Sequence, residues 1–434
     1  MNQFFEMNEK RRSEPTRVIR TKLSIPCYRF PPAESVMRES TMDSGLTSPE
    51  FQLSERNRGI DVLRGISILL VIFNHIGIRI PLSRTAIASV SPSWLINLMN
   101  WRGYEAVFIF FVISGFLITG MSLRRWGALN RIGIGGFYAR RFARIAPLLV
   151  VVVLMLSVLH LGGVPDFVIH HANQSLLGAI WAALGLHLNW YEGHTDWLPG
   201  GWDVLWSLSI EEVFYLAFPV IALLTRRIWI LLPLLVLLAV SLPFSRDALA
   251  GQPIWQEKAY LPGMAGIATG MIGALVAALF TPLRKVFSRA LGVLGGVCLA
   301  TMMIAEKYLW PVLGNAIFLL LTVSTMCLLV GLQWGQVEGA QRSWPGLGWL
   351  RSMGQHSYEI YLTHMLVVFG GVAMFRNFGA RLDSGFFWYA PIVLVCWLLG
   401  AVVARYFSVP CDLALRKFLL KHERMPVDPL IETG

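Results

Sequence analysis

The chain has 434 residues, of which 55% are hydrophobic and only 15% are charged. A soluble globular protein carries about 25% charged residues, so the composition excludes that class. It favours an integral membrane protein of the helical kind, because many apolar runs reach the ~20 residues that cross the hydrocarbon core. The formal charge of +11 fits lysines and arginines collected in cytosolic loops, and we predict no nucleic-acid partner.

Residues 1–57 are rich in Ser, Glu, Arg and Pro and too polar to build a core, so we predict a flexible cytosolic tail. The run at 175–190 is short and ends in Trp and His, which predicts a re-entrant or interfacial segment. Ten other runs are predicted to span the membrane. They lie at about 60–80, 103–122, 146–164, 205–224, 228–245, 261–281, 290–305, 311–332, 357–376 and 387–408.

The distribution of arginines sets the orientation. With ten spans and a cytosolic amino terminus, the arginine-rich stretch between residues 124 and 144 faces the cytosol. The fold class is therefore an all-α integral membrane protein with about ten transmembrane helices plus one short re-entrant or interfacial segment. Residues 58–410 form the membrane domain, and 411–434 form a basic tail that is also cytosolic.

The first span carries two ionisable groups, Arg64 and His75. They are eleven residues apart, close to three helical turns, so both point from nearly the same face about 16 Å apart. Asp61, one turn before Arg64, is predicted to pair with it. An ionisable side chain inside a span is a functional hypothesis by default. The alternative is a membrane anchor and a polar contact between helices.

Two acids, Glu211 and Glu212, lie in the span that begins WSLSIEEVFY. Carboxylates there are unfavourable unless they are paired or hydrated. The two are about 100° apart on a helix, so only one is expected to face the interior. Beside an imidazole, Glu211 would orient the ring and stabilise the imidazolium, as a carboxylate does in hydrolase triads. Two interfacial acids facing water are the alternative.

The segment FYARRFARIAP is predicted to be an inward loop, followed by a helix that Pro147 starts. Arg141 and Arg144 are three residues apart and share one face if the segment is helical. Arginine suits the oxygens of a phosphorylated ligand, although the positive-inside rule also explains arginines here.

Late in the chain, the stretch SYEIYLTH places Tyr361 beside His364 near the start of a span, where packing is the alternative to chemistry. Four tryptophans are predicted on the outer side, where they would stack on a sugar ring or form an ordinary aromatic belt. They are Trp190, Trp197, Trp202 and Trp206. The five cysteines have no metal-type spacing, and we predict no metal site.

Five of these segments together resemble the bacterial membrane acyltransferase-3 family, which includes O-acetyltransferases of cell-surface glycans. They occur in the family's order. They are DVLRGISILLVIFNH (61–75), FIFFVISGFLIT (108–119), FYARRFARIAP (137–147), WSLSIEEVFY (206–215) and SYEIYLTH (357–364). The chain departs from the family at Phe108, where relatives often have an acid, and at Val62 and Val213.

The resemblance implies an O-acyltransferase of the bacterial cytoplasmic (inner) membrane. It would move an acyl group, acetyl in the simplest case, from acyl-CoA to a hydroxyl of a glycan or lipid-linked sugar. The implied roles are catalysis by His75 with Glu211, binding of the acyl-CoA by Arg64, Arg141 and Arg144, and support from Asp61, Glu212, Tyr361 and His364. A proton-coupled transporter or flippase of a lipid-linked glycan is the alternative. The oligomeric state stays open.

Overall fold

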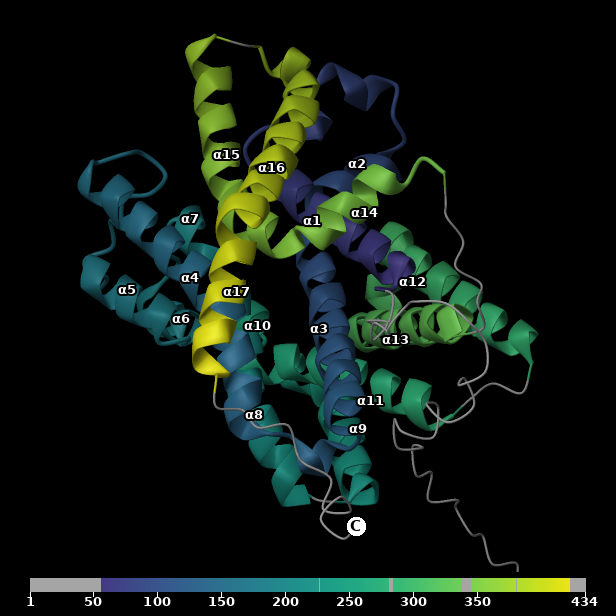
Figure 1. The fold of residues 1–434 in the computed structure, drawn as a ribbon. Helices are drawn as coiled ribbons and strands as arrows, with labels where there is room; N and C mark the ends of the chain where they lie inside the picture. The colour runs from purple at the N-terminus through teal and green to yellow at the C-terminus, as the bar shows by residue number, and fades with distance from the viewer. Residues whose placement is uncertain (1–55, 226, 281–283, 338–344, 380, 422–434) are drawn as a thin grey trace, which may run out of the picture. The chain divides into compact units, whose positions relative to one another are not determined.

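The computed structural model describes residues 56–225, 227–280, 284–337, 345–379 and 381–421. Within these ranges the secondary structure is helical and no strand occurs (Figure 1). Ten helical stretches of this described part are long and apolar enough to cross a membrane, which confirms the predicted fold class. The predicted tail residues 1–55 and 422–434 lie outside the described part.

The membrane-crossing stretches are built from thirteen named helices, some of which join end to end. They are α1 (Arg58–Gly77), α3 (Gly103–Trp126), α4 (Ile134–Leu161), α7 (Gly200–Asp203) with α8 (Trp206–Thr225), α9 (Ile228–Asp247), α10 (Pro253–Lys258) with α11 (Tyr260–Leu279), α12 (Lys285–Leu313), α13 (Ala316–Val337), α15 (Ser357–Asn377), and α16 (Tyr389–Val403), which leads into α17 (Val409–Leu419). Because α17 continues beyond residue 410, the last stretch extends past the predicted end of the membrane domain.

Residues 175–190 do not cross as one span. They form α5 (Leu176–Leu184) and the first part of α6 (Leu188–Thr195). The helical conformation is interrupted between them at Leu186, whose φ is +61°. A bulky residue at positive φ is rare and marks a sharp turn. Helix α5 exposes Trp181, 67% of whose surface is accessible. Two short helices with an exposed apolar face fit the predicted re-entrant or interfacial segment.

The arginine-rich segment is a helix and not a loop, which corrects the prediction made from FYARRFARIAP. Helix α4 begins at Ile134 and runs through Pro147. A proline removes one backbone hydrogen bond and crowds the preceding turn, yet here it does not begin the helix. Arg141 and Arg144 therefore lie on one helical face, the condition under which they can act together.

Helix α1 lies at the centre of the packing. Asn57 caps its first turn by accepting hydrogen bonds from the backbone amides of Gly59 and Ile60. The short helix α14 (Gly348–Gln355) packs so closely that a Cβ on Gly65 would lie 1.9 Å from the Leu350 carbonyl oxygen. Glycine is therefore required where the two backbones meet. Helix α15 packs against both α1 and α16, and α16 lies beside it in Figure 1.

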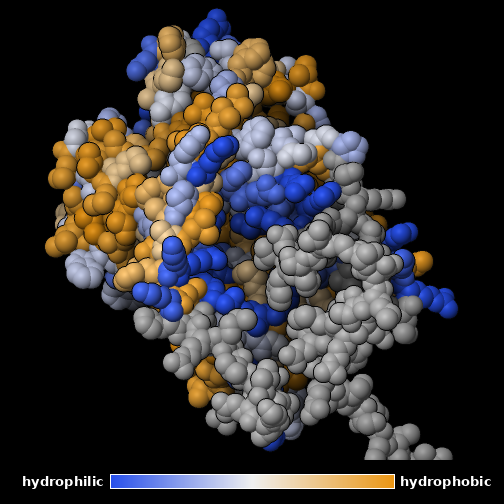
Figure 2. Space-filling model, viewed as in Figure 1, coloured by the Kyte–Doolittle hydropathy of each residue, from blue (hydrophilic) through white to orange (hydrophobic). Residues whose placement is uncertain are grey.

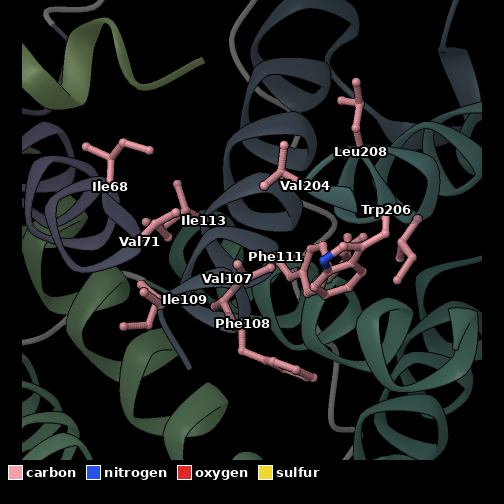
Figure 3. Packing of buried hydrophobic residues seen from close by; sticks show 14 of the residues in the cluster. Ile68, Val71, Val107, Phe108, Ile109, Phe111, Ile113, Val204, Trp206 and Leu208 are labelled. Atoms are coloured by element: carbon pink, nitrogen blue, oxygen red, sulfur yellow. The ribbon is translucent and has the colours of Figure 1, made fainter. Parts of the chain in front are cut away.

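The core is apolar where α1, α3 and α8 meet, as Figure 3 shows with Val71, Phe111 and Trp206. Phe108 is 1% exposed, and its ring lies 5.0 Å from that of Phe318. The position where relatives often carry an acid is thus filled with packed aromatic rings. Figure 2 shows apolar side chains over α4 and α5, and hydrophilic ones gathered over α14.

Candidate active site

The imidazole of His75 lies beside that of His364, with ring centroids 5.1 Å apart. His364 is completely buried and its Nδ1 is 2.6 Å from the backbone oxygen of Tyr361. A carbonyl can only accept, so Nδ1 carries the hydrogen and Nε2 is left with a lone pair. This Nε2 is buried and has no hydrogen-bond partner among the described residues. The histidine pair, His75 and His364, thus contains an unused basic nitrogen.

Tyr361 anchors the neighbouring helix. Its hydroxyl donates to the backbone oxygen of Val204 at 2.9 Å and lies 2.6 Å from the hydroxyl of Ser207. These bonds tie α15 to the start of α8, and the Tyr361 ring lies 5.7 Å from that of His364. Its place is consistent with the predicted supporting role.

Arg64 contacts the same helix as His75, as the shared-face argument requires. Its Nε and Nη2 both donate to the hydroxyl of Ser357, at 3.1 and 2.7 Å. The predicted hydrogen-bonded pair with Asp61 is wrong in detail. The Asp61 carboxylate accepts instead from Arg56 Nε at 2.7 Å and acts on Arg64 only through a longer-range Coulomb interaction.

Arg144 forms an ion pair with Glu359, whose carboxylate is fully buried; the Nη1 to Oε1 distance is 2.8 Å. Its guanidinium lies 5.1 Å from the Tyr358 ring. Arg141 stacks on the Tyr215 ring at 4.3 Å. The predicted phosphate-binding arginines therefore face into the bundle, and an acid already balances Arg144.

Glu211 accepts a hydrogen bond from the hydroxyl of Ser114 at 2.9 Å. Arg64 and Arg141 act on it electrostatically. In the described part of the chain no hydrogen bond joins Glu211 to His75, so its predicted role as orienting acid stays a prediction. The ring next to His75 is that of His364. Glu212 is buried and its Oε1 has no partner in the described part.

These contacts form two neighbouring polar centres between α1, α4, α8 and α15. The arginine cluster consists of Arg64, Arg141 and Arg144 with Glu211 and Glu359. The histidine pair lies about two helical turns further along α15, because Ser357 and His364 are seven residues apart. Buried polar groups are normally hydrogen-bonded, so the atoms of Glu212 and His364 that have no partner among the described residues mark polar capacity that the packing does not use. Among the described residues, no three His, Cys, Asp or Glu side chains group closely enough to hold a metal ion.

Sequence reasoning missed Ser357 and Glu359, although both stand in the quoted stretch SYEIYLTH. An acid in the first turn of a span was the signal that could have found Glu359. The four tryptophans do not form one outer surface. Trp202 and Trp206 are buried, whereas Trp190 and Trp197 are 49% and 36% exposed.

A bundle of ten apolar helices with buried arginines, carboxylates and a histidine pair between them is a polytopic membrane protein with an interior polar site. The chain belongs to the acyltransferase-3 family, whose model, described as an acyltransferase domain, matches residues 57–406. This match confirms the resemblance found in the sequence, and it places both polar centres inside the matched domain.

Named relatives point to the same chemistry. A Staphylococcus aureus (strain COL) protein named "Putative O-acetyltransferase" is 30% identical over 168 residues, 38% of this chain and 24% of its own length. The peptidoglycan O-acetyltransferase OatA of Listeria monocytogenes is 28% identical over 211 residues, 47% of this chain and 29% of its own. The chain thus matches about a quarter of each relative's length. No solved structure matches it.

Proposed function

We propose that the protein is a membrane O-acyltransferase that moves an acyl group, acetyl in the simplest case, from acyl-CoA to a hydroxyl of a glycan. One observation carries this proposal. Arg64 and His75 of α1 contact Ser357 and His364 of one facing helix, so that an anion-binding centre and a basic centre share one helix interface. That arrangement can hold a phosphorylated donor at one end and activate a hydroxyl at the other.

The donor would bind at the arginine cluster. Among the described residues, the Arg64 side chain donates only to Ser357, and Arg141 is held by ring stacking, so both keep N–H groups for phosphate oxygens. Arginine's planar fork offers a phosphate two-point contacts. Arg144 is already balanced by Glu359 and would position the cluster more than bind the donor.

The transfer needs a base near a hydroxyl. His75 would take the proton of the acceptor hydroxyl while that oxygen attacks the thioester carbonyl carbon. The new C–O bond forms, the C–S bond breaks, and the CoA thiolate takes the proton from the imidazolium. A covalent acyl-imidazole on His75 is the variant of this scheme. His364, whose lone pair faces no protein donor, would orient or relay that proton.

Names of relatives support the acceptor class. OatA of Listeria monocytogenes is named a peptidoglycan O-acetyltransferase, and we propose a peptidoglycan-type glycan as the acceptor here. The arginines on α4 support a topology in which both termini face the cytosol of a bacterium. The donor would then enter from the cytosol, and the glycan would lie on the opposite side of the inner membrane.

The proposal is tested with purified protein in lipid, labelled acetyl-CoA and muramidase-released peptidoglycan fragments. We expect thiol release and label in the glycan with wild type, and neither with His75→Ala. His170→Ala, which changes an exposed histidine, is the matched control and should behave as wild type. Full activity in His75→Ala contradicts the mechanism. No thioester use by folded wild type contradicts the function and favours the transporter alternative.

A further inference from the structure

Arg79 lies just beyond the end of α1 and next to the histidine pair. Its Nη1 donates to the backbone oxygen of His75 at 2.9 Å, and its guanidinium lies 4.2 Å from the Phe369 ring. This is the one hydrogen bond of the Arg79 side chain within the described residues, so four of its five N–H groups have no protein acceptor there. Because the residue is only half-buried, these donors are open to a ligand beside the histidine pair.

Two carboxylates act on Arg79 from a distance. Burial lowers its pKa, while Asp166 and Asp203 oppose that shift. Neither acid forms an ion pair with it within the part of the chain that the structure describes. Donors on Arg79 and acceptors on these acids, which are not paired with one another in that part of the chain, suit a hydroxyl-rich molecule, because each sugar hydroxyl both donates and accepts.

Asp203 belongs to a buried charge cluster. Lys258, 1% exposed, contacts both Glu192 Oε2 at 2.8 Å and the carboxylate of Asp203. Burial raises the pKa of Glu192 well above its usual range, and the neighbouring Asp203 adds to the shift. Asp203 is the carboxylate of the pair with side-chain exposure, at 19%, so it is the one that a ligand can reach.

Trp197 completes this surface. The Lys258 ammonium lies 4.0 Å from the centre of its ring, and 36% of the residue is exposed. Two bonds hold its loop: Gln174 Nε2 donates to the Asp196 backbone oxygen at 2.6 Å, and the Trp197 amide donates to Asp196 Oδ1 at 2.7 Å. An aromatic ring fixed beside a carboxylate offers a flat apolar face next to a hydrogen-bond acceptor.

We infer that Arg79, Asp203 and Trp197 form a subsite that binds the sugar of the acceptor and directs its hydroxyl toward His75. The inference rests on the proposed function and adds the residues that recognise the acceptor. Trp197 stacks on a pyranose ring, while Asp203 accepts from sugar hydroxyls and Arg79 donates to them. The helix α7, which carries Gly200 against Arg79 Nη2, fixes the distance between the two charges.

The test compares initial rates against muramidase-released peptidoglycan fragments and against acetyl-CoA. We expect Arg79→Lys and Trp197→Ala each to raise the KM for the fragments about tenfold or more, with the KM for acetyl-CoA unchanged. Trp197→Phe, which keeps an aromatic ring, should restore most of the affinity. Trp181→Ala removes another exposed tryptophan and serves as control. An unchanged KM for the fragments in both variants overturns the subsite and leaves the proposed function standing.

A second measurement keeps the subsite testable if wild type consumes no thioester. The same proteins are then titrated with the fragments by calorimetry. Binding to wild type that is lost in Arg79→Lys and Trp197→Ala supports the subsite although the proposed function has failed. Absence of binding to wild type overturns the subsite as well.

Discussion

Two kinds of arginine occur inside this membrane domain. Arg102 has a protein acceptor for each of its three guanidinium nitrogens: its Nε donates to the Met303 backbone oxygen at 3.1 Å, Nη1 to Glu105 at 2.8 Å and Nη2 to Glu306 at 2.7 Å. Arg64 and Arg79, by contrast, donate to one hydroxyl and one carbonyl. Arg102 is buried, whereas Arg64 and Arg79 are half-buried, so the second kind keeps donors that solvent or a ligand can reach.

The number of protein partners distinguishes arginines that join helices from arginines that can bind a ligand. Arg246 is held by several protein partners, as Arg102 is. Its guanidinium contacts Asn315, Tyr104 and the Gln256 backbone oxygen and lies 4.1 Å from the Phe318 ring. Such a group joins helices through several fixed contacts. A buried cation with spare donors carries an unfavourable desolvation energy that a bound anion or hydroxyl would relieve. Of the arginines with few protein partners, Arg79 lies beside the histidine pair and Arg64 lies about three helical turns before His75 on α1.

The largest effect on activity is expected at His75. His75→Ala should lower the rate of acyl transfer by about 10²- to 10⁴-fold, the usual contribution of a general base. Its melting temperature should stay near that of wild type, because the imidazole contributes only a ring contact. Activity per folded molecule and thermal unfolding in detergent measure the two effects. A large loss of stability would show that His75 stabilises the fold, as Arg102 does.

The reverse pattern is expected at Arg102. Arg102→Leu leaves Glu105 and Glu306 without their cation and should lower the free energy of unfolding by about 3–5 kcal/mol. The activity of the molecules that remain folded should not change. The double variant Arg102→Leu with Glu105→Gln should recover part of the stability, since one buried charge is removed. Lower activity per folded molecule would contradict the assignment of Arg102 to the arginines that only stabilise the fold.

Arg64 is expected to affect donor binding. Arg64→Gln should raise the KM for acetyl-CoA about 10- to 100-fold, since a charged hydrogen bond contributes about 1.5–3 kcal/mol. Arg64→Lys should recover part of this, because it keeps the charge and loses the planar fork. The exposed Arg84 offers a control in Arg84→Gln, which should leave the KM unchanged. Equal effects at both positions would indicate general electrostatic attraction and not a site.

The sequence was sufficient for the membrane class and the span count, because apolar runs and arginine placement follow directly from the bilayer. It also put Arg64 and His75 on one face, because helical periodicity is local. It failed on the partners of those groups. Asp61 bonds to Arg56, five residues before it, instead of to Arg64. His75 lies beside His364, a contact that depends on how separate helices pack. Local spacing cannot supply that information.

The helix α4 shows a second limit of sequence reasoning. A cluster of arginines before a proline predicts a loop, yet the segment is helical from Ile134 onward. Tertiary contacts of Arg144 with Glu359 and of Arg141 with Tyr215 give the charged turn buried partners, which propensity alone does not foresee. Arg79 had no signal in the sequence at all, since its free donors are visible only in the structure.

The smallest predicted effect concerns His364. It decides whether this residue serves activity or only stabilises the fold. His364→Gln keeps a hydrogen-bonding side chain but removes the imidazole lone pair, so we expect the rate to fall about three- to tenfold if His364 only orients His75. A shift of the pH–rate profile in this variant, with the KM for both substrates unchanged, would show that the two rings titrate together. An unchanged rate and profile would instead assign His364 to packing, because its Nδ1 bond to Tyr361 would then be its whole contribution.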